Sequence, residues 1–199
     1  MGNGEANHID KDGVPLKVIV LVDEHDRQVG LCGKLETHRQ GLLHRAFSVI
    51  IKNDAGQILL QQRAAGKYHS PGLWANACCG HPGDGDDTGQ AARRRLGEEM
   101  GFETDLYPGR RHSYRADVGG GLIENEFVHV FFGRFNGTIV PDAAEAAAYR
   151  WLDPDALLAD VAANPDSYSA WFRDYLQHFG DEIIAWPAQE MEDGDKGQG

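Results

Sequence analysis

The strongest structural signal in this sequence lies between Gly80 and Phe102. Thr88–Met100 has a helical pattern, with Asp87 or Thr88 as its N-cap and Gly101 as the residue that ends it. Its apolar face consists of Ala91, Ala92, Leu96 and Met100. The charged residues between these positions are typical of an ordinary amphipathic helix with one face in solvent, unless they bind a ligand.

Strand patterns surround this helix. Alternate residues of His44–Lys52 form two faces, one with Phe47, Val49 and Ile51 and one with Ser48 and Ile50. The turn residues 53–56 predict that Gln57–Gln62 returns as a hairpin partner. The other expected elements are strands at Lys17–Val22 and Glu124–Phe135, and helices at Asp155–Ala163 and Ser169–Phe179. This irregular order favours an α+β layered fold, with mixed β-sheets flanked by helices, over a doubly wound one.

The composition is that of one globular domain. The chain has 199 residues, of which 41% are hydrophobic and 25% charged. We expect the domain to span residues 16–182. Residues 1–15 and the acidic segment 183–199 offer little to bury, so we expect both to be disordered.

The charge and hydropathy patterns limit the partners. A formal net charge of −12 disfavours nucleic acid, and no apolar run approaches the roughly 18 residues of a membrane span. The first residues lack the basic and apolar regions of a secretory signal, so we expect a cytoplasmic protein. No long apolar heptad demands an assembly, and we expect a monomer or a homodimer. Three cysteines do not form a disulfide framework, which suggests chemistry or metal binding instead.

Three histidines and two glutamates form a candidate metal site. His38 and His44 bracket the segment that leads into a strand, and His81 follows a pair of cysteines. Glu124 and Glu126 are two residues apart, so an extended backbone points both to one face. Three nitrogens and two carboxylates suit octahedral Mn²⁺, Mg²⁺, Zn²⁺ or Fe²⁺ rather than a structural zinc site. Taken alone, each of these histidines is more simply a surface or hydrogen-bonded residue.

The other histidines receive the ordinary interpretation. On the expected strand, His129 alternates with Glu126 and faces away from both glutamates. The remaining histidines, also interpreted as non-ligands, are His8, His25, His69, His112 and His178.

The helix carries a motif that resembles the Nudix box. It reads Gly80-x5-Asp86-x7-Arg94-Arg95-Leu96-Gly97-Glu98-Glu99-Met100-Gly101-Phe102, against G-x5-E-x7-R-E-U-x-E-E-x-G-U, where U is a bulky apolar residue. In such a box, carboxylates hold Mg²⁺ against a diphosphate. Here Asp86 replaces one glutamate and Arg95 replaces another. A guanidinium in place of a metal-binding carboxylate favours holding a diphosphate over cleaving it.

Four further segments extend the resemblance. They are His44-Arg-Ala-Phe-Ser48, Pro71-Gly-Leu-Trp-Ala-Asn76, Cys79-Gly-His-Pro82 and Glu124-Asn-Glu126. Together they resemble type I isopentenyl-diphosphate Δ-isomerase, a Nudix-fold enzyme family, over roughly residues 16–180. That family interconverts isopentenyl and dimethylallyl diphosphate with one divalent cation in a His/Glu cage and Mg²⁺ on the diphosphate.

The resemblance implies roles for individual residues. The cage would consist of His38, His44, His81, Glu124 and Glu126, and would hold Mn²⁺ or another divalent cation. Glu99 would reach the second cation, Mg²⁺. Cys79 would be the catalytic thiol, while Cys78 would point the other way on an extended segment. Tyr114 would support Glu126, and Trp171 would place its ring beside the substrate. The diphosphate would meet Arg63, Lys67 and Arg95, with Lys34 as a weaker fourth cation.

This isomerisation adds a proton at C4 of an alkene and removes one from C2, so it needs an acid and a base on opposite faces of a dry pocket. Cys79 and Glu126 suit that task in either direction. A Nudix diphosphate hydrolase is the alternative, and it would need the glutamate that Arg95 replaces. A non-catalytic prenyl-diphosphate binder would need the cage but no opposed acid–base pair.

Overall fold

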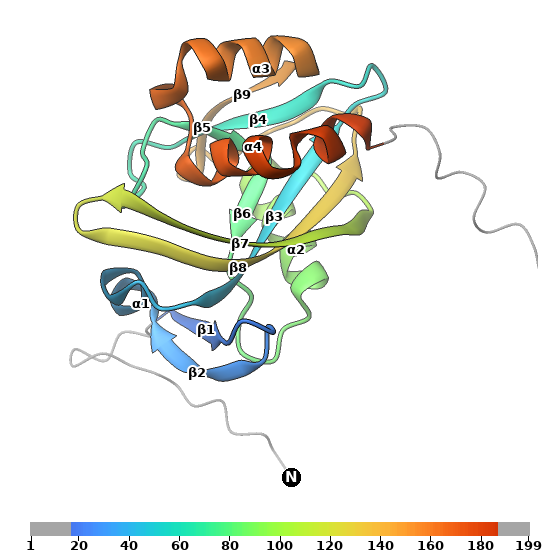
Figure 1. Ribbon diagram of the computed structural model, residues 1–199. Coiled ribbons are helices and arrows are strands. Elements are labelled where there is room, and N and C mark those ends of the chain that lie inside the picture. The colour runs from blue at the N-terminus through green and yellow to red at the C-terminus, as the bar shows by residue number, and fades with distance from the viewer. Residues whose placement is uncertain (1–16, 187–199) are drawn as a thin grey trace, which may run out of the picture.

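The computed structural model describes residues 17–186 (Figure 1). The strands are β1 (Val18–Val22), β2 (Gln28–Gly33), β3 (His44–Lys52), β4 (Ile58–Arg63), β5 (Trp74–Asn76), β6 (Cys78–Gly80), β7 (Leu106–Gly119), β8 (Leu122–Arg134) and β9 (Ala146–Leu152). The helices are α1 (Lys34–Gln40), α2 (Thr88–Met100), α3 (Pro154–Ala163) and α4 (Ala170–Ala185), with a 3₁₀ turn at Pro165–Ser167. Within residues 17–186, no helix has the length and apolar character needed to cross a bilayer.

The sheet is mixed, which confirms the expected α+β class. β3 pairs in parallel with β8 along its whole length, from His44↔Glu126 to Lys52↔Arg134. Its other edge is shared by three antiparallel strands, β1, β6 and β4. β3 is therefore the strand around which the sheet is organised.

The expected hairpin between His44–Lys52 and Gln57–Gln62 forms at its turn only. The two strands pair at Lys52↔Ile58 and then separate. β6 takes the adjoining edge of β3, and β4 pairs with β5 and β9 instead. The predicted hairpin is therefore confirmed at its turn, but its pairing is short because β6 occupies the adjoining edge of β3.

The two faces of β3 bury two separate hydrophobic cores, as its alternation predicts. Phe47, Val49 and Ile51 pack with α2 in one core. Ala46 and Ile50 pack with α4 in the other, where Ser48 also points. In Figure 1, α4 crosses one side of β3 and of the β7–β8 hairpin, with α2 on the other side.

Helix α2 has the predicted bounds and caps. The Asp87 side chain accepts a hydrogen bond from Gln90 N at 2.9 Å. Gly101 ends the helix in the left-handed region with φ 74°, and its N–H donates to Gly97 O.

Helix α4 is longer than predicted. It passes the expected end at 179 and the expected domain boundary at 182 and reaches Ala185, because Ile183 continues the buried stripe of Phe179 one turn later. Phe179 has non-helical backbone angles, which mark a kink. Lys52 Nζ donates to Ile184 O (2.6 Å) and Trp186 O (3.1 Å), which satisfies carbonyls at the helix end. The disorder expected for residues 1–15 and for the chain after 186 lies outside the described residues.

Candidate active site

A cavity of about 260 Å³ is lined by residues of α1, β4, the 64–73 connection, β6, α2, β7, β8 and α4. Every side chain nominated from the sequence lines it except two. His38 and His44 are fully buried and lie against Glu124, which does line the cavity. The fold thus brings the nominated residues to one place, although they come from distant parts of the chain.

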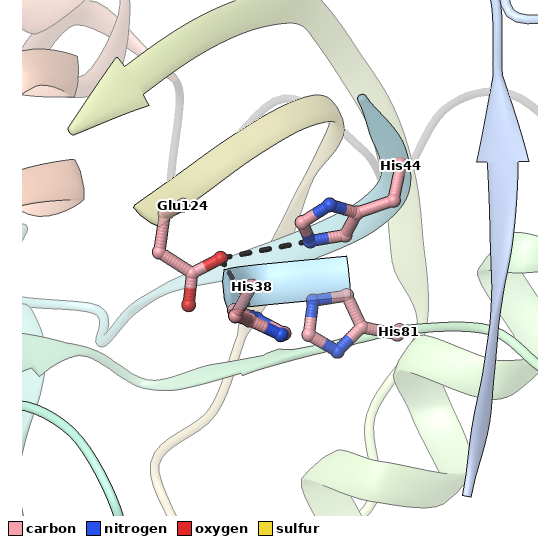
Figure 2. Close-up of side chains that lie close together, drawn as sticks. All are labelled: His38, His44, His81 and Glu124. Carbon is pink, nitrogen blue, oxygen red and sulfur yellow. Dashed lines mark ion pairs between the residues drawn. The ribbon is translucent and has the colours of Figure 1, made fainter. Parts of the chain in front are cut away.

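Four of the five nominated cage residues, His38, His44, His81 and Glu124, lie close together (Figure 2), and Glu126 contacts His81 and His44 beside them. The parallel register puts His44 opposite Glu126, and Glu124, two residues earlier, lies on the same face of β8. His38 Nε2 lies 3.2 Å from Glu124 Oε2, and His44 Nε2 lies 3.6 Å from the same oxygen. His81 Nε2 lies 3.0 Å from Glu126 Oε1. One candidate ligand atom each from His38, His44, His81 and Glu124 lies within 4.8 Å of the others.

Backbone carbonyls fix the orientation of two of these rings. His38 Nδ1 lies 2.6 Å from Lys34 O, and His44 Nδ1 lies 2.8 Å from Leu42 O. Because a carbonyl only accepts, both Nδ1 atoms carry hydrogen, and Nε2 is the atom turned to the carboxylates. These two Nε2 atoms and Glu124 Oε2 are buried without a hydrogen-bond partner. Three orphaned ligand-type atoms around one point fit a divalent cation.

The two buried carboxylates of the cage, Glu124 and Glu126, favour a positive charge beside them. Burial opposes ionisation of His44, yet the facing carboxylates of Glu124 and Glu126 outweigh it and raise the pKa of His44 to about 10. Burial alone would raise the pKa of Glu124, but the imidazoles of His38, His44 and His69 hold it well below its ordinary value. The site therefore stabilises ionised carboxylates in a buried place, as a cation site must.

Cys79 and Glu126 line the same cavity. Cys79 Sγ donates to Asn76 Oδ1 at 3.2 Å and lies 3.3 Å from Ser48 Oγ. Burial raises the pKa of Cys79 to about 12, so the thiol keeps its hydrogen. Tyr114 donates to Glu126 Oε2 at 2.7 Å. Cys78, by contrast, is fully buried in the α2 core.

Cationic and aromatic side chains line another part of the cavity. The Arg63 guanidinium lies 5.1 Å from the centre of the Trp171 ring, and Lys34 Nζ lies 4.6 Å from the centre of the Tyr68 ring. Trp171 Nε1 donates to Asn76 Oδ1 at 3.3 Å, which holds the indole beside Cys79. Burial and the positive charge of Lys17 lower the pKa of Lys34 to about 8, although Glu124 opposes this.

Two further cations, Arg95 of α2 and Lys67, pair with acidic side chains. Arg95 Nη2 lies 2.7 Å from Glu99 Oε1 and 3.2 Å from Glu145 Oε1. Lys67 Nζ also pairs with Glu145. Burial would raise the pKa of Glu145, but Lys67 and Arg95 outweigh it and lower that pKa. Without a ligand, these cations are neutralised by acidic neighbours.

Comparison with known proteins places this geometry in a family. The NUDIX domain family model matches residues 42–172. An isopentenyl-diphosphate Delta-isomerase of Burkholderia multivorans is 51% identical over 83% of this chain and 94% of its own length. One from Serratia proteamaculans is 44% identical over 85% of this chain and 96% of its own length. The chain belongs to the isopentenyl-diphosphate Delta-isomerase family.

Solved structures support the fold. This isomerase-family chain is similar to DR0079 of Deinococcus radiodurans, with a TM-score of 0.65 and 20% identity over 82% of this chain and 99% of that one. It is also similar to a MutT protein of Methanosarcina mazei, with a TM-score of 0.57 and 20% identity over 70% of this chain and 94% of that one. At this identity the likeness shows the Nudix fold alone.

The departures of this family member from the Nudix box have structural consequences. Asp86, at a box glutamate position, accepts from Gly83 N (3.0 Å) and Arg94 Nη2 (3.1 Å) and does not line the cavity. Arg95 does line it. The box therefore presents a guanidinium and the buried Glu99 to the cavity.

The structure adds contacts that the sequence did not reveal. His69 Nε2 lies 3.0 Å from Glu124 Oε1, although His69 was interpreted as an ordinary histidine. Asn76 and Ser48 contact the Cys79 sulfur. No periodicity marks these three residues. A search for polar side chains within the motif segments could have found Asn76 and Ser48, but not His69, which lies two residues before Pro71.

Other histidines lie away from the cavity. His129 pairs with Asp26, with Nε2 2.8 Å from Oδ2, so it faces away from the two glutamates as the strand alternation predicts. His112 and His178 both lie against Asp174, at 2.5 and 3.4 Å.

Proposed function

We propose that this chain isomerises isopentenyl diphosphate to dimethylallyl diphosphate, with Cys79 and Glu126 as the two proton-transfer groups. The observation that carries the proposal is their placement on one cavity that also presents several cations. Relatives that match most of the chain bear the name of this activity. A thiol that keeps its hydrogen and an ionised carboxylate form a complementary acid–base pair.

The diphosphate is bound by the cationic side of the cavity. Arg63, Lys67 and Arg95, with Lys34, supply positive charge and hydrogen-bond donors. Because Lys67 and Arg95 already face Glu145, the substrate competes with this carboxylate for them. This contact fixes one end of the substrate and leaves its short alkene to reach the region of Cys79.

The alkene then lies where Cys79 and Glu126 can each exchange a proton with it. Tyr114 holds the Glu126 carboxylate through Oε2. The Trp171 indole faces the region where a tertiary cation develops, and cation–π attraction is worth about 0.5–2 kcal/mol there. Buried surroundings keep water from capturing that cation. Both groups exchange roles in the reverse direction.

We assign the cage to Mn²⁺ or another divalent cation, and Glu99 to Mg²⁺ on the diphosphate. The orphaned atoms of His38, His44 and Glu124 support the first assignment. Glu99 is nearly fully buried and lines the cavity, which supports the second. A cation bound in the cage would set the acidity of Glu126, and a cation at Glu99 would neutralise phosphate charge.

Diphosphate hydrolysis is disfavoured by the same residues. Asp86 lies outside the cavity, and Arg95 stands where a metal-binding glutamate is usual. A hydrolase also has no use for a thiol on the cavity wall.

Incubation with isopentenyl diphosphate in D₂O tests the proposal. We expect deuterium in the five-carbon products without phosphate release. Cys79→Ala and Glu126→Gln should each lower deuterium uptake by at least about 10²–10⁴-fold, because each removes a proton-transfer group. Cys78→Ala is the matched control and should retain activity, because Cys78 faces the α2 core. Normal turnover by either active-site variant, or release of phosphate by the wild type, would contradict the proposal.

A further inference from the structure

We infer that His69 is a positioning residue that holds Glu124 by one carboxylate oxygen, so that only the other oxygen faces the cage. The inference rests on the proposed metal centre and deepens it. It adds a residue that controls the centre without binding the cation.

The two oxygens of Glu124 have different surroundings. Oε2 lies 3.2 Å from His38 Nε2 and 3.6 Å from His44 Nε2, and it has no hydrogen-bond partner. Oε1 lies 3.0 Å from His69 Nε2. A cation in the cage therefore meets one free oxygen, and His69 occupies the other.

The location of the hydrogen separates His69 from His38 and His44, the two cage histidines that face the other oxygen of Glu124. A carboxylate only accepts, so His69 Nε2 carries the hydrogen in its contact with Glu124. A nitrogen that carries hydrogen offers no lone pair to a metal. In His38 and His44 a carbonyl oxygen already takes the Nδ1 hydrogen, so Nε2 is the atom that a cation can reach. His69 Nδ1 lies 3.4 Å from the Ser70 hydroxyl, which can donate to it.

His69 also belongs to the substrate side of the cavity. It lies on the 64–73 connection, two residues after Lys67, and its main-chain oxygen accepts from Arg63 Nη2 at 3.2 Å. Its ring lies edge-on to Trp171, with 5.8 Å between ring centres. His69 is buried, so these contacts are made away from solvent. One residue thus connects Glu124 with Arg63 and the indole.

The expected effect is on cation affinity. Partners that orient a metal ligand typically change metal affinity or activity by about 10–100-fold when removed. In His69→Ala, Glu124 loses its donor and both its oxygens become available to the cation. In His69→Gln, a side-chain N–H remains available to Oε1.

Titration with Mn²⁺, against a competing chromogenic chelator, measures this effect without substrate. We expect one tight site in the wild type, affinity weakened about 10–100-fold in His69→Ala, and affinity close to wild type in His69→Gln. The Co²⁺ absorption spectrum should change in His69→Ala, because Glu124 can then bind through both oxygens. His25→Ala is the control, since His25 is exposed and pairs with Glu24, which is not a cage residue.

Unchanged Mn²⁺ affinity in His69→Ala would overturn the inference. So would a loss as complete as that of Glu124→Ala in both His69 variants, because His69 would then be a ligand itself. Absence of a tight site in the wild type would overturn the metal centre, which is a separate result. If thermal melting shows that His69→Ala does not fold, the test relies on the Co²⁺ spectrum and the Mn²⁺ affinity of His69→Gln. Weakened Mn²⁺ affinity in His69→Gln would then contradict the inference.

Discussion

The surroundings of individual residues in this site shift their pKa values and so set their protonation states. Burial keeps the hydrogen on Cys79, while imidazoles keep Glu124 and Glu126 ionised despite their burial. Lys34 is the cavity cation whose charge changes near physiological pH, because burial and Lys17 lower its pKa to about 8.

The pH dependence of substrate capture follows from Lys34. A lysine with a lowered pKa is charged below that value and neutral above it, so diphosphate binding should weaken as pH rises through about 8. We therefore expect a basic limb in the pH profile, where kcat/KM for isopentenyl diphosphate falls about tenfold or more. This factor corresponds to the loss of one charge-assisted hydrogen bond. Lys34→Arg should move the limb to higher pH, because a guanidinium stays charged. Lys17→Arg, which preserves the neighbouring charge, should leave it in place, and a limb unaffected by Lys34→Arg would refute the assignment.

At the scale of elements, α2 connects the fold to the chemistry. Its apolar face packs against Phe47 and Val49 of β3, while Arg95 and Glu99 reach the cavity. Its C-terminal end is set by Gly101, which has φ 74° and lies against the backbone of Val140.

Replacement of Gly101 should therefore be costly. A Cβ at Gly101 would lie 2.2 Å from Val140 O, a backbone atom that cannot swing away. We expect Gly101→Ala to lower the free energy of unfolding by about 3–5 kcal/mol, from backbone strain plus overpacking. Gly85 has a similar φ of 75° with nothing within 4 Å of a built Cβ, so Gly85→Ala should cost only about 1–2 kcal/mol. Urea denaturation measures both, and equal losses would show that the Val140 contact relaxes freely.

At the scale of the whole molecule, the mixed sheet separates two cores and gathers the site from both. α1, β3, β8 and the residue after β6 supply the cage, whereas α2, α4 and the 64–73 connection supply the substrate side. The proposed metal centre therefore brings together segments that are distant in sequence, from His38 to Glu126.

Cation binding should stabilise the whole fold. A cation that binds the folded but not the unfolded chain adds about 2.7 kcal/mol at a hundredfold excess over Kd. For a chain of this size we expect Mn²⁺ to raise Tm by about 5–10 °C over EDTA-treated protein. Glu124→Gln should abolish this shift, and Glu36→Gln, on the same helix as His38 but with an exposed side chain, should retain it. An equal shift in wild type and Glu124→Gln would place the cation elsewhere.

The sequence by itself determined the features that local patterns encode. The caps and apolar stripe of Thr88–Met100 predicted α2, and the alternation of β3 predicted which residues enter each core, because such patterns depend on backbone geometry over a few residues. The cage residues were nominated by residue type and by the spacing of Glu124 and Glu126.

Tertiary structure decided what depends on contacts between distant segments. It placed β6 rather than β4 along the middle of β3, extended α4 through the burial of Ile183, and brought His69 to Glu124. The orientation of Cys78 and Cys79 follows from the pairing of β6 with β3. A window of a few residues carries no signal for these contacts. Each of them joins residues that are far apart in sequence, so it depends on how the whole chain folds.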